Sequence, residues 1–421
     1  MIYWMHPQGC SQRRRKLTVR RPPDYISNLP DGIIEEIIQR LPIKDSVRTS
    51  VLSTKWKNRW MTIPNLIFDE HCMRQSSRKV LTDKFAGIID QVLVQHTGRI
   101  DKFKLSVYYL KAEYACSYID HWIDVLSKKR IQDLSIEIDK GCVFVVTDSL
   151  FSCKNLRILK LRQVLIRHLP AAFNGFKHLK DLYLDYVIIH CEDDFYSLLA
   201  SKCPLLEKLT MKDMGKAPFV VQVPPTLKYL HLIGMFTNMR IENAEFLTVF
   251  VIRVSTRTRS LYEYLSIGFI PVKLPTMLIY LKEIFLVMDI GNINDLASAF
   301  CLFRSAPNLE RVRIGEWFST PTSMEYADLF WHIQKKFLYR FNKLKFLRLE
   351  QLSCWTSEVL LIDYMMRYSP HLEELIIEVK ETVNTQGFLW FKHIVGRYRS
   401  PRTRVVVKVV KVHDRFEKGL S

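Results

Sequence analysis

The sequence has no long hydrophobic run. In 421 residues the apolar stretches are short, such as 277–281 and 405–407, whereas a membrane-spanning helix needs about 20 consecutive apolar residues. The N-terminus has no apolar core ahead of its arginines, unlike a secretory signal peptide. We therefore expect no membrane-spanning segment, no secretory signal and no membrane partner.

Paired cysteines and the common catalytic motifs are also missing. The nine cysteines are widely separated and form no C-x-x-C, which is typical of reduced thiols in the nucleus or cytoplasm. No phosphate-binding loop, dinucleotide fingerprint, G-x-S-x-G, H-E-x-x-H or EF-hand pattern occurs. His190 and Cys191 are adjacent, but no second pair at zinc-ligand spacing accompanies them. We therefore expect no enzyme activity, no catalytic residue, no metal and no cofactor.

Basic residues, in contrast, are abundant. The 62 Lys and Arg exceed the 43 Asp and Glu and give a formal charge of +19, which favours an acidic protein, an anionic ligand or nucleic acid as partner. Several arginines lie within residues 1–23, for which we predict a basic flexible tail. Direct DNA binding would also require a recognition helix or a base-stacking platform. The sequence shows neither, so we do not expect nucleic acid to be the partner.

Residues 24–64 have the pattern of a small helical module. Apolar residues recur at helical spacing over 29–41, which predicts an amphipathic helix. A second helix is expected to begin at Asp45, and a third to place Trp56 and Trp60 on one face. A module this small cannot bury all of its apolar side chains. We therefore expect an exposed patch that binds a partner or docks on the rest of the chain.

Most of the remaining chain is an irregular repeat. The pattern L-x-x-L-x-L or a close variant starts ten times, at 131, 156, 179, 206, 227, 247, 281, 309, 344 and 372. These starts are 20 to 35 residues apart, near the period of roughly 20–29 residues of leucine-rich repeats. The fourth and sixth positions should point inward from a short strand, so that stacked copies share one core. Helical stripes between copies predict helices on the convex side of a curved parallel sheet over residues 99–380.

Two segments flank the repeats. The helical pattern at 80–95 leads us to assign residues 65–98 as a helical linker. Residues 381–421 depart from the repeat, and the alternating VVVKVVKV within them predicts a final strand. We therefore predict a C-terminal cap of helix and strand that covers the last open core of the array.

The string LPDGIIEEIIQRLPIKDSVRTSVLSTKWKNRW at 29–60 resembles the F-box of plant F-box proteins with leucine-rich repeats, the F-box/FBD/LRR group. Residues 381–421 do not show the FBD segment that often ends members of this group. The resemblance implies an α/β fold in which a three-helix F-box precedes a leucine-rich-repeat solenoid. It also implies that apolar residues of the F-box form a face that binds the Skp-type adaptor of a cullin-based SCF ubiquitin ligase. A small domain also needs some of its apolar residues for its own core. The implied adaptor-binding residues are Leu29, Pro30, Ile33, Ile34, Ile37, Leu41, Val51, Leu52 and Trp56.

The repeat geometry also exposes a second candidate surface. Side chains flanking the inward positions of each strand should line the concave face. Its middle is aromatic and basic, and arginine beside aromatic residues is enriched at binding hot spots. We therefore hypothesise a protein substrate with an acidic segment and some apolar anchors. The candidate substrate-binding residues are Tyr183, Lys208, Tyr229, His231, Phe285, Arg311, Arg313, Phe346 and Arg348.

Together these features predict a non-catalytic, substrate-recognition subunit of an SCF-type ubiquitin ligase, located in the nucleus or cytoplasm. Its mechanism would be proximity, because it would hold the substrate near a ubiquitin-charged enzyme without supplying a catalytic group. One alternative is an F-box receptor that senses an anion or small molecule at the basic concave centre. Another is an F-box scaffold outside any ligase, or a basic nucleic-acid-binding protein.

Overall fold

A computed structural model describes the structure of this chain in two compact units, Met1–Trp60 and Met61–Ser421. The predicted tail at 1–23 lies outside the described residues. Residues 25–69, 72, 83–110, 117–141, 143–214, 224–234, 244–254, 273–274, 277–316, 330–332, 334, 339–381, 383, 385–398 and 403–410 are described.

The first unit is built on two short α-helices. Helix α1 spans Asp31–Arg40 and buries Ile34 and Ile38, which lie one turn apart on the same face. Helix α2 spans Ile43–Arg48 and is followed by the 3-10 turn η1 at Thr49–Val51. It begins two residues before Asp45, because Pro42 already has a fixed φ suited to the helix start.

The third predicted helix is replaced by turns and by the 3-10 helix η2 at Arg59–Thr62. Asn58 has a φ of 65°, and this left-handed conformation interrupts a right-handed helix. The indole Nε1 of Trp56 donates a hydrogen bond to the backbone carbonyl of Ile26 at 3.1 Å. Trp56 and Trp60 are both buried, as their apolar surface requires.

The second unit contains a 14-stranded sheet in which every strand pairing among the described residues is parallel. The strands follow one another in chain order, and β4 pairs with β5 beside this path. The strands are β1 Asn65–Phe68, β2 Lys102–Leu110, β3 Asp133–Gly141, β4 Phe144–Val145, β5 Ile158–Ile166, β6 Asp181–Ile189, β7 Lys208–Lys212, β8 Tyr229–Gly234, β9 Val249–Val254, β10 Glu283–Met288, β11 Arg311–Glu316, β12 Phe346–Leu352, β13 Glu374–Lys380 and β14 Arg404–Val410.

Each of the ten repeat copies forms a strand that begins at the third residue of the copy. The side chains at the fourth and sixth positions of all copies are buried, with exposed fractions of 0 to 3%. Leu209 and Met211 in β7 and Leu347 and Leu349 in β12 are examples, all at 0%. Since burying one such side chain contributes roughly 1.5–3 kcal/mol, this ladder is the main core of the unit. The predicted α/β solenoid is confirmed.

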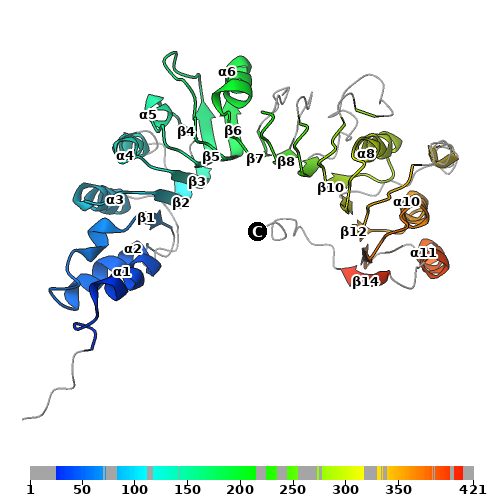
Figure 1. Ribbon diagram of the computed structural model, residues 1–421, viewed down its shortest axis with the longest axis horizontal. Coiled ribbons are helices and arrows are strands. Elements are labelled where there is room, and N and C mark those ends of the chain that lie inside the picture. The colour runs from blue at the N-terminus through cyan, green and yellow to red at the C-terminus, as the bar shows by residue number, and fades with distance from the viewer. Residues whose placement is uncertain are drawn as a thin grey trace, which may run out of the picture. The chain divides into compact units, whose positions relative to one another are not determined.

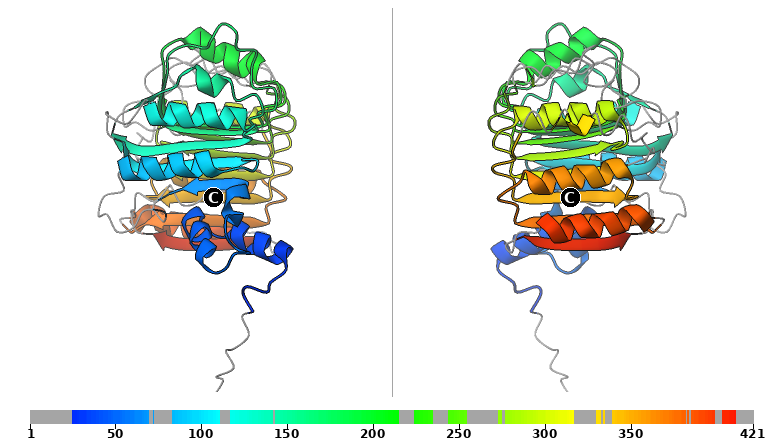
Figure 2. Two further views of the ribbon diagram at one scale, coloured as in Figure 1. Left: turned by 90° about the vertical axis from the view of Figure 1, so that its left-hand side faces the viewer. Right: turned by 90° about the vertical axis from the view of Figure 1, so that its right-hand side faces the viewer.

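Helices connect the parallel strands and lie on the outer face of the curved sheet (Figure 1). In the right-hand view of Figure 2, the two C-terminal helices lie in front of the strands and run along them. The helices predicted between repeat copies are all present. The helices of this layer are α3 Asp83–Gln95, α4 Ser117–Lys128, α5 Asp148–Phe151, α6 Glu192–Ser197, α8 Ile293–Ser305, α10 Thr356–Arg367 and α11 Thr385–Tyr398.

The two ends of the array each contain a strand and a helix outside residues 99–380. Residues 65–98 contain the strand β1 as well as a helix, because Leu66 and Phe68 alternate with exposed Asn65 and half-buried Ile67 and join the core. At the other end, α11 and β14 form the predicted helix and strand. Val407 and Val409 lie in register with buried residues of β13 but are 42% and 66% exposed. Strand β14 is therefore the last strand of the described sheet, and its side chains Val407 and Val409 remain partly exposed.

Candidate protein-binding surfaces

The first unit exposes apolar side chains on α1 and at the end of η1. Ile33 and Ile37 are 44% and 36% exposed, and they lie one turn apart on α1. Val51 and Leu52 are 87% and 46% exposed. Isoleucine, valine and leucine are among the residues most often buried, so these exposed side chains mark a surface available to a partner. We call Ile33, Ile37, Val51 and Leu52 the F-box patch.

The predicted adaptor-binding residues fall into three groups. Ile34 and Trp56 are buried and pack the interior, so they offer no surface to a partner in this structure. Leu29 and Leu41 are half-buried. The exposed members are Pro30, Ile33, Ile37, Val51 and Leu52. This division arises because one face of α1 packs into the core of the small unit, whereas the adjacent face can remain exposed.

Ion pairs connect the start of α1 to the turn that carries Arg59. The Arg59 guanidinium lies 3.0 Å from a carboxylate oxygen of Asp31 and 3.3 Å from one of Glu35. Its hydrogen bond to Asp31 lowers the pKa of that exposed carboxyl group below its ordinary value. Lys55 Nζ donates to the backbone carbonyl of Leu29. Exposed pairs are weak individually, but together they orient α1 against this turn.

The concave face of the sheet presents two rows of side chains that cross β8 to β12. Parallel pairing places equivalent positions of neighbouring strands side by side. The first row consists of Tyr229, Val249, Glu283, Arg311 and Phe346. The second row consists of His231, Val251, Phe285, Arg313 and Arg348.

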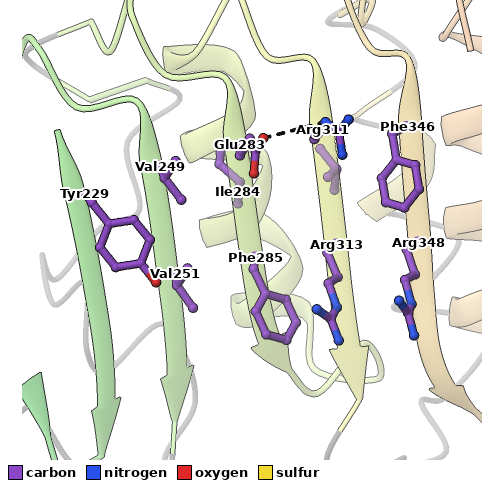
Figure 3. A pocket seen from close by; sticks show the side chains of 11 residues that line it. Tyr229, Val249, Val251, Glu283, Ile284, Phe285, Arg311, Arg313, Phe346 and Arg348 are labelled. Carbon is purple, nitrogen blue, oxygen red and sulfur yellow. Dashed lines mark ion pairs between the residues drawn. The ribbon is translucent and has the colours of Figure 1, made fainter. Parts of the chain in front are cut away.

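Members of both rows line a pocket of about 340 Å³ on this face, which we call the concave groove. Figure 3 shows side chains of β8, β9, β10, β11 and β12 around the same open space. Val249 and Val251, together with Glu283, line it as well. Of the predicted substrate-binding residues, the groove brings together Tyr229, Phe285, Arg311, Arg313, Phe346 and Arg348.

Two groove arginines share one buried acid. Glu350 Oε1 lies 2.5 Å from Arg313 Nε and 2.8 Å from Arg348 Nε, and the Glu350 side chain is only 4% exposed. Arg348 Nη2 also lies 2.7 Å from Glu378 Oε1. These close contacts hold both guanidinium groups in place. Glu350 and Glu378 therefore largely neutralise the charges of the two arginines.

Aromatic rings lie beside two of the groove arginines, Arg313 and Arg311. The Arg313 guanidinium lies 4.5 Å from the ring centroid of Phe285, and that of Arg311 lies 5.4 Å from the centroid of Phe346. These separations are within the range of cation–π attraction. Arg311 is paired less tightly than the other two, because its Nε lies 3.6 Å from Glu283 Oε1 and both side chains are at least half exposed.

Tyr183, Lys208 and His231 lie on β6 to β8, outside the groove lining. The Tyr183 hydroxyl donates a hydrogen bond to Asp185 at 3.1 Å, and burial raises the Tyr183 pKa above its ordinary value. Lys208 Nζ lies 5.0 Å from the centroid of the Tyr229 ring. Tyr183 and Lys208 extend the polar and aromatic surface beyond the groove.

His231 is almost fully buried. Burial lowers the pKa of this imidazole to about 4, and the positive charges of Lys212, Lys208 and Arg253 act in the same direction. Its Nε2 has no hydrogen-bond partner among the described residues. The ring is therefore neutral near pH 7 and acts as a packed side chain beneath the surface, and it is not an exposed contact.

Sequence reasoning missed several residues that shape the groove. Val249 and Val251 line the groove. Their repeat copy has valine at both concave positions, and no charged or aromatic residue there indicated a binding surface. Glu350 and Glu378 occupy the seventh positions of their copies. Extending the alternation two residues further along each strand would have placed them beside the arginines.

Other kinds of site find no support within the described parts of the chain. No group of three or more His, Cys, Asp or Glu side chains there could hold a metal ion. No described helix is long and apolar enough to cross a membrane.

Two protein families match this chain. Residues 26–68 match the F-box domain family. Residues 119–293 match a family described as the LRR repeats of the FBD-associated F-box protein At5g56370. The first match contains both helices of the first unit, and the second contains the strands from β3 to β10.

Curated relatives agree with these matches. F-box/FBD/LRR-repeat protein At1g13570 of Arabidopsis thaliana is 30% identical over 386 residues, which cover 84% of this chain and 91% of the relative. F-box/LRR-repeat protein At4g14103 of the same plant is 30% identical over 213 residues, covering 49% of this chain and 55% of the relative. The putative FBD-associated F-box protein At5g53635 is 34% identical over 193 residues, covering 45% and 43%. With an F-box, a repeat solenoid and a relative that matches along most of both chains, this chain belongs to the plant F-box/LRR-repeat protein family.

Proposed function

We propose that this chain is the substrate-recognition subunit of an SCF-type ubiquitin ligase. Its F-box would bind the Skp-type adaptor and, through it, a cullin, while its concave face would bind a protein substrate. F-box/LRR proteins are generally adaptors and not enzymes, and F-box domains generally bind Skp-type adaptors. The observation that carries the proposal is the F-box patch, whose apolar side chains are exposed within a matched F-box. We propose the nucleus or cytoplasm as its location.

Proximity would be the mechanism. A substrate bound at the concave face would have its lysines held near a ubiquitin-charged conjugating enzyme recruited through the cullin. This raises their effective concentration without any catalytic group in this chain. The sheet and its buried ladder form a stiff support, because close-packed cores deform little. Catalysis would then occur on other subunits of the ligase.

A pull-down with purified Skp-type adaptor tests this proposal. Ile33→Asp combined with Ile37→Asp places charge on the exposed face of α1 and leaves the buried face intact. We expect adaptor retention to fall roughly tenfold or more, as at interface hot spots. Val94→Asp in α3 is the matched control, because Val94 is an 81% exposed apolar residue outside the first unit. Failure of the well-folded parent protein to retain adaptor contradicts the proposal.

A second candidate function is an F-box receptor that senses an anion. Lys208, Lys212 and Arg253 act electrostatically on His231, so positive charge gathers over β7 to β9. Thermal unfolding with and without inositol hexakisphosphate tests it, because a ligand of the folded state raises the midpoint. A raised midpoint that Lys208→Gln abolishes supports the receptor. An unchanged midpoint contradicts it and leaves direct substrate binding.

A further inference from the structure

The concave groove contains an apolar depression. Val249 and Val251 lie on β9 between Tyr229 on β8 and Phe285 on β10 (Figure 3). Valine is shorter than the aromatic side chains on either side. Val249 is half-buried and Val251 is only 2% exposed, so the open part of the depression lies at Val249 and Val251 forms its floor. The flanking strands are roughly 10 Å apart, which is two interstrand spacings. One large apolar side chain of a partner fits between the two rings.

The charges on the β10 to β13 side of this depression are balanced. Three arginines, Arg311, Arg313 and Arg348, face three glutamates, Glu283, Glu350 and Glu378. A highly acidic partner therefore has little net attraction to this side of the groove, although the sequence suggested an acidic segment. The ion pairs of the three arginines differ in strength. The Arg313 and Arg348 pairs are short, and their glutamates are only 4% and 13% exposed, whereas the Arg311–Glu283 pair is long and exposed.

Arg311 is therefore the guanidinium that an incoming carboxylate can take over. Its present pair with Glu283 costs little to disrupt, because exposed ion pairs contribute only about 0–1 kcal/mol. A carboxylate that meets a guanidinium in a bidentate fashion forms stronger bonds. Phe346 lies against the Arg311 guanidinium and supports its position.

The spacing defines the partner. Arg311 on β11 is two strands from the valines on β9, and an extended peptide places alternate side chains on one face about 7 Å apart. The long Arg311 side chain spans the remaining distance. We infer that the concave groove binds an extended peptide segment of a substrate protein, with a large apolar residue over Val249 and Val251 and a single acidic residue two positions away on Arg311. This inference rests on the proposed role of the concave face in substrate recognition.

Parallel selection of short random displayed peptides tests the inference. The full chain, Arg311→Gln and Arg404→Gln serve as three baits. Arg404 is the matched control because it also loses one positive charge, lies on β14 outside the groove, and has only a 3.8 Å ion pair. We expect the parent and Arg404→Gln to enrich peptides with an apolar residue two positions from an acid, and Arg311→Gln to lose them.

A second test measures the binding constants of one enriched peptide for the parent protein and for two variants. Arg311→Gln should weaken binding roughly tenfold or more, since bonds to charged groups are the strong ones. Glu283→Gln should tighten binding by up to about fivefold, because it removes the carboxylate that competes for Arg311. Weaker binding with Glu283→Gln would mean that the peptide brings a cation, which overturns the inference.

Two other outcomes also overturn it. One is enrichment of peptides that are basic, or that carry acidic runs without an apolar residue. The other is no enrichment by the parent beyond that of Arg311→Gln. Adaptor retention by the same preparations keeps the two proposals separate. Loss of adaptor binding with the peptide motif intact contradicts the ligase proposal alone, and the reverse contradicts the groove assignment alone.

Discussion

Arg313 on β11 and Glu350 on β12 form an ion pair beside the concave groove, with Arg313 Nε 2.5 Å from Glu350 Oε1. Glu350 also lies 2.8 Å from Arg348 Nε, so one buried carboxylate orients two arginines. A surface that looks strongly basic in the sequence is therefore close to neutral where the pocket lies. In the peptide recognition that we infer, this relationship replaces the expected acidic segment by a single well-placed acid beside an apolar anchor.

Loss of this buried acid should destabilise the repeat array. Glu350→Gln leaves Arg313 and Arg348 without their shared charge, and breaking a buried pair from one side is costly. The guanidinium groups are a quarter to a third exposed, so water recovers part of the loss and we expect a cost of about 1–3 kcal/mol. Chemical unfolding of parent and variant measures it. Glu374→Gln is the control, because its pair with Arg404 is long and exposed, and an equal cost for the two variants would contradict the assignment.

Much of the fold could be predicted, because the repeat pattern and the core have the same physical cause. A strand that buries its fourth and sixth positions must carry apolar residues there in every copy, and Leu159, Leu230 and Ile377 are all buried as expected. The concave residues followed from the same alternation.

Features that depend on neighbouring strands could not be predicted in the same way. Glu350 on β12 and Glu378 on β13 reach Arg313 and Arg348 of the neighbouring strands only because the strands pair in parallel. The replacement of the third F-box helix by turns depends on the left-handed backbone at Asn58, and asparagine adopts this conformation in only some contexts.

Two glycines in α11 should respond oppositely to alanine. A Cβ at Gly387 would lie 1.8 Å from the backbone carbonyl oxygen of Cys354, whereas at Gly396 it would meet nothing within 4 Å. Gly387→Ala should force α11 away from this loop and cost about 1–3 kcal/mol, as overpacking does. Gly396→Ala should stabilise by up to about 1 kcal/mol, because alanine favours a helix. Thermal unfolding midpoints that move in the same direction would contradict this packing of α11.

Stability should fall in acid partly through His231. Its folded-state pKa of about 4 lies below the ordinary value of 6.5, so the folded state disfavours protonation. The contribution of neutral His231 is complete above pH 6.5, declines as the pH falls below that value, and is lost once the pH passes through 4. This difference corresponds to at most about 3 kcal/mol.

A glutamine at this position isolates the His231 contribution. His231→Gln cannot take up a proton, so its unfolding midpoint should depend less on pH than that of the parent over this window. Other titrating groups are common to both proteins and cancel in the comparison. Parallel pH profiles for the two proteins would show that His231 is not a buried neutral imidazole.

Filling the apolar depression should block peptide binding without harming the fold. Val249 is half-buried and faces the groove, so Val249→Phe places a ring where the partner's apolar residue would lie. We expect the affinity for an enriched peptide to fall roughly tenfold, because the loss of one buried apolar anchor is worth about 1–3 kcal/mol. Fluorescence anisotropy measures this loss. Unchanged affinity together with unchanged unfolding would place the peptide elsewhere on the face.

Calorimetric titration of the purified chain with purified Skp-type adaptor tests the central claim most directly. The account predicts a one-to-one complex for the parent and an affinity at least about tenfold weaker for the Ile33→Asp, Ile37→Asp variant, because the F-box patch is the exposed apolar surface of the matched F-box. Circular dichroism on the same samples confirms that both proteins are folded. A folded parent that forms no complex with the adaptor would contradict the assignment of this chain to a ubiquitin ligase.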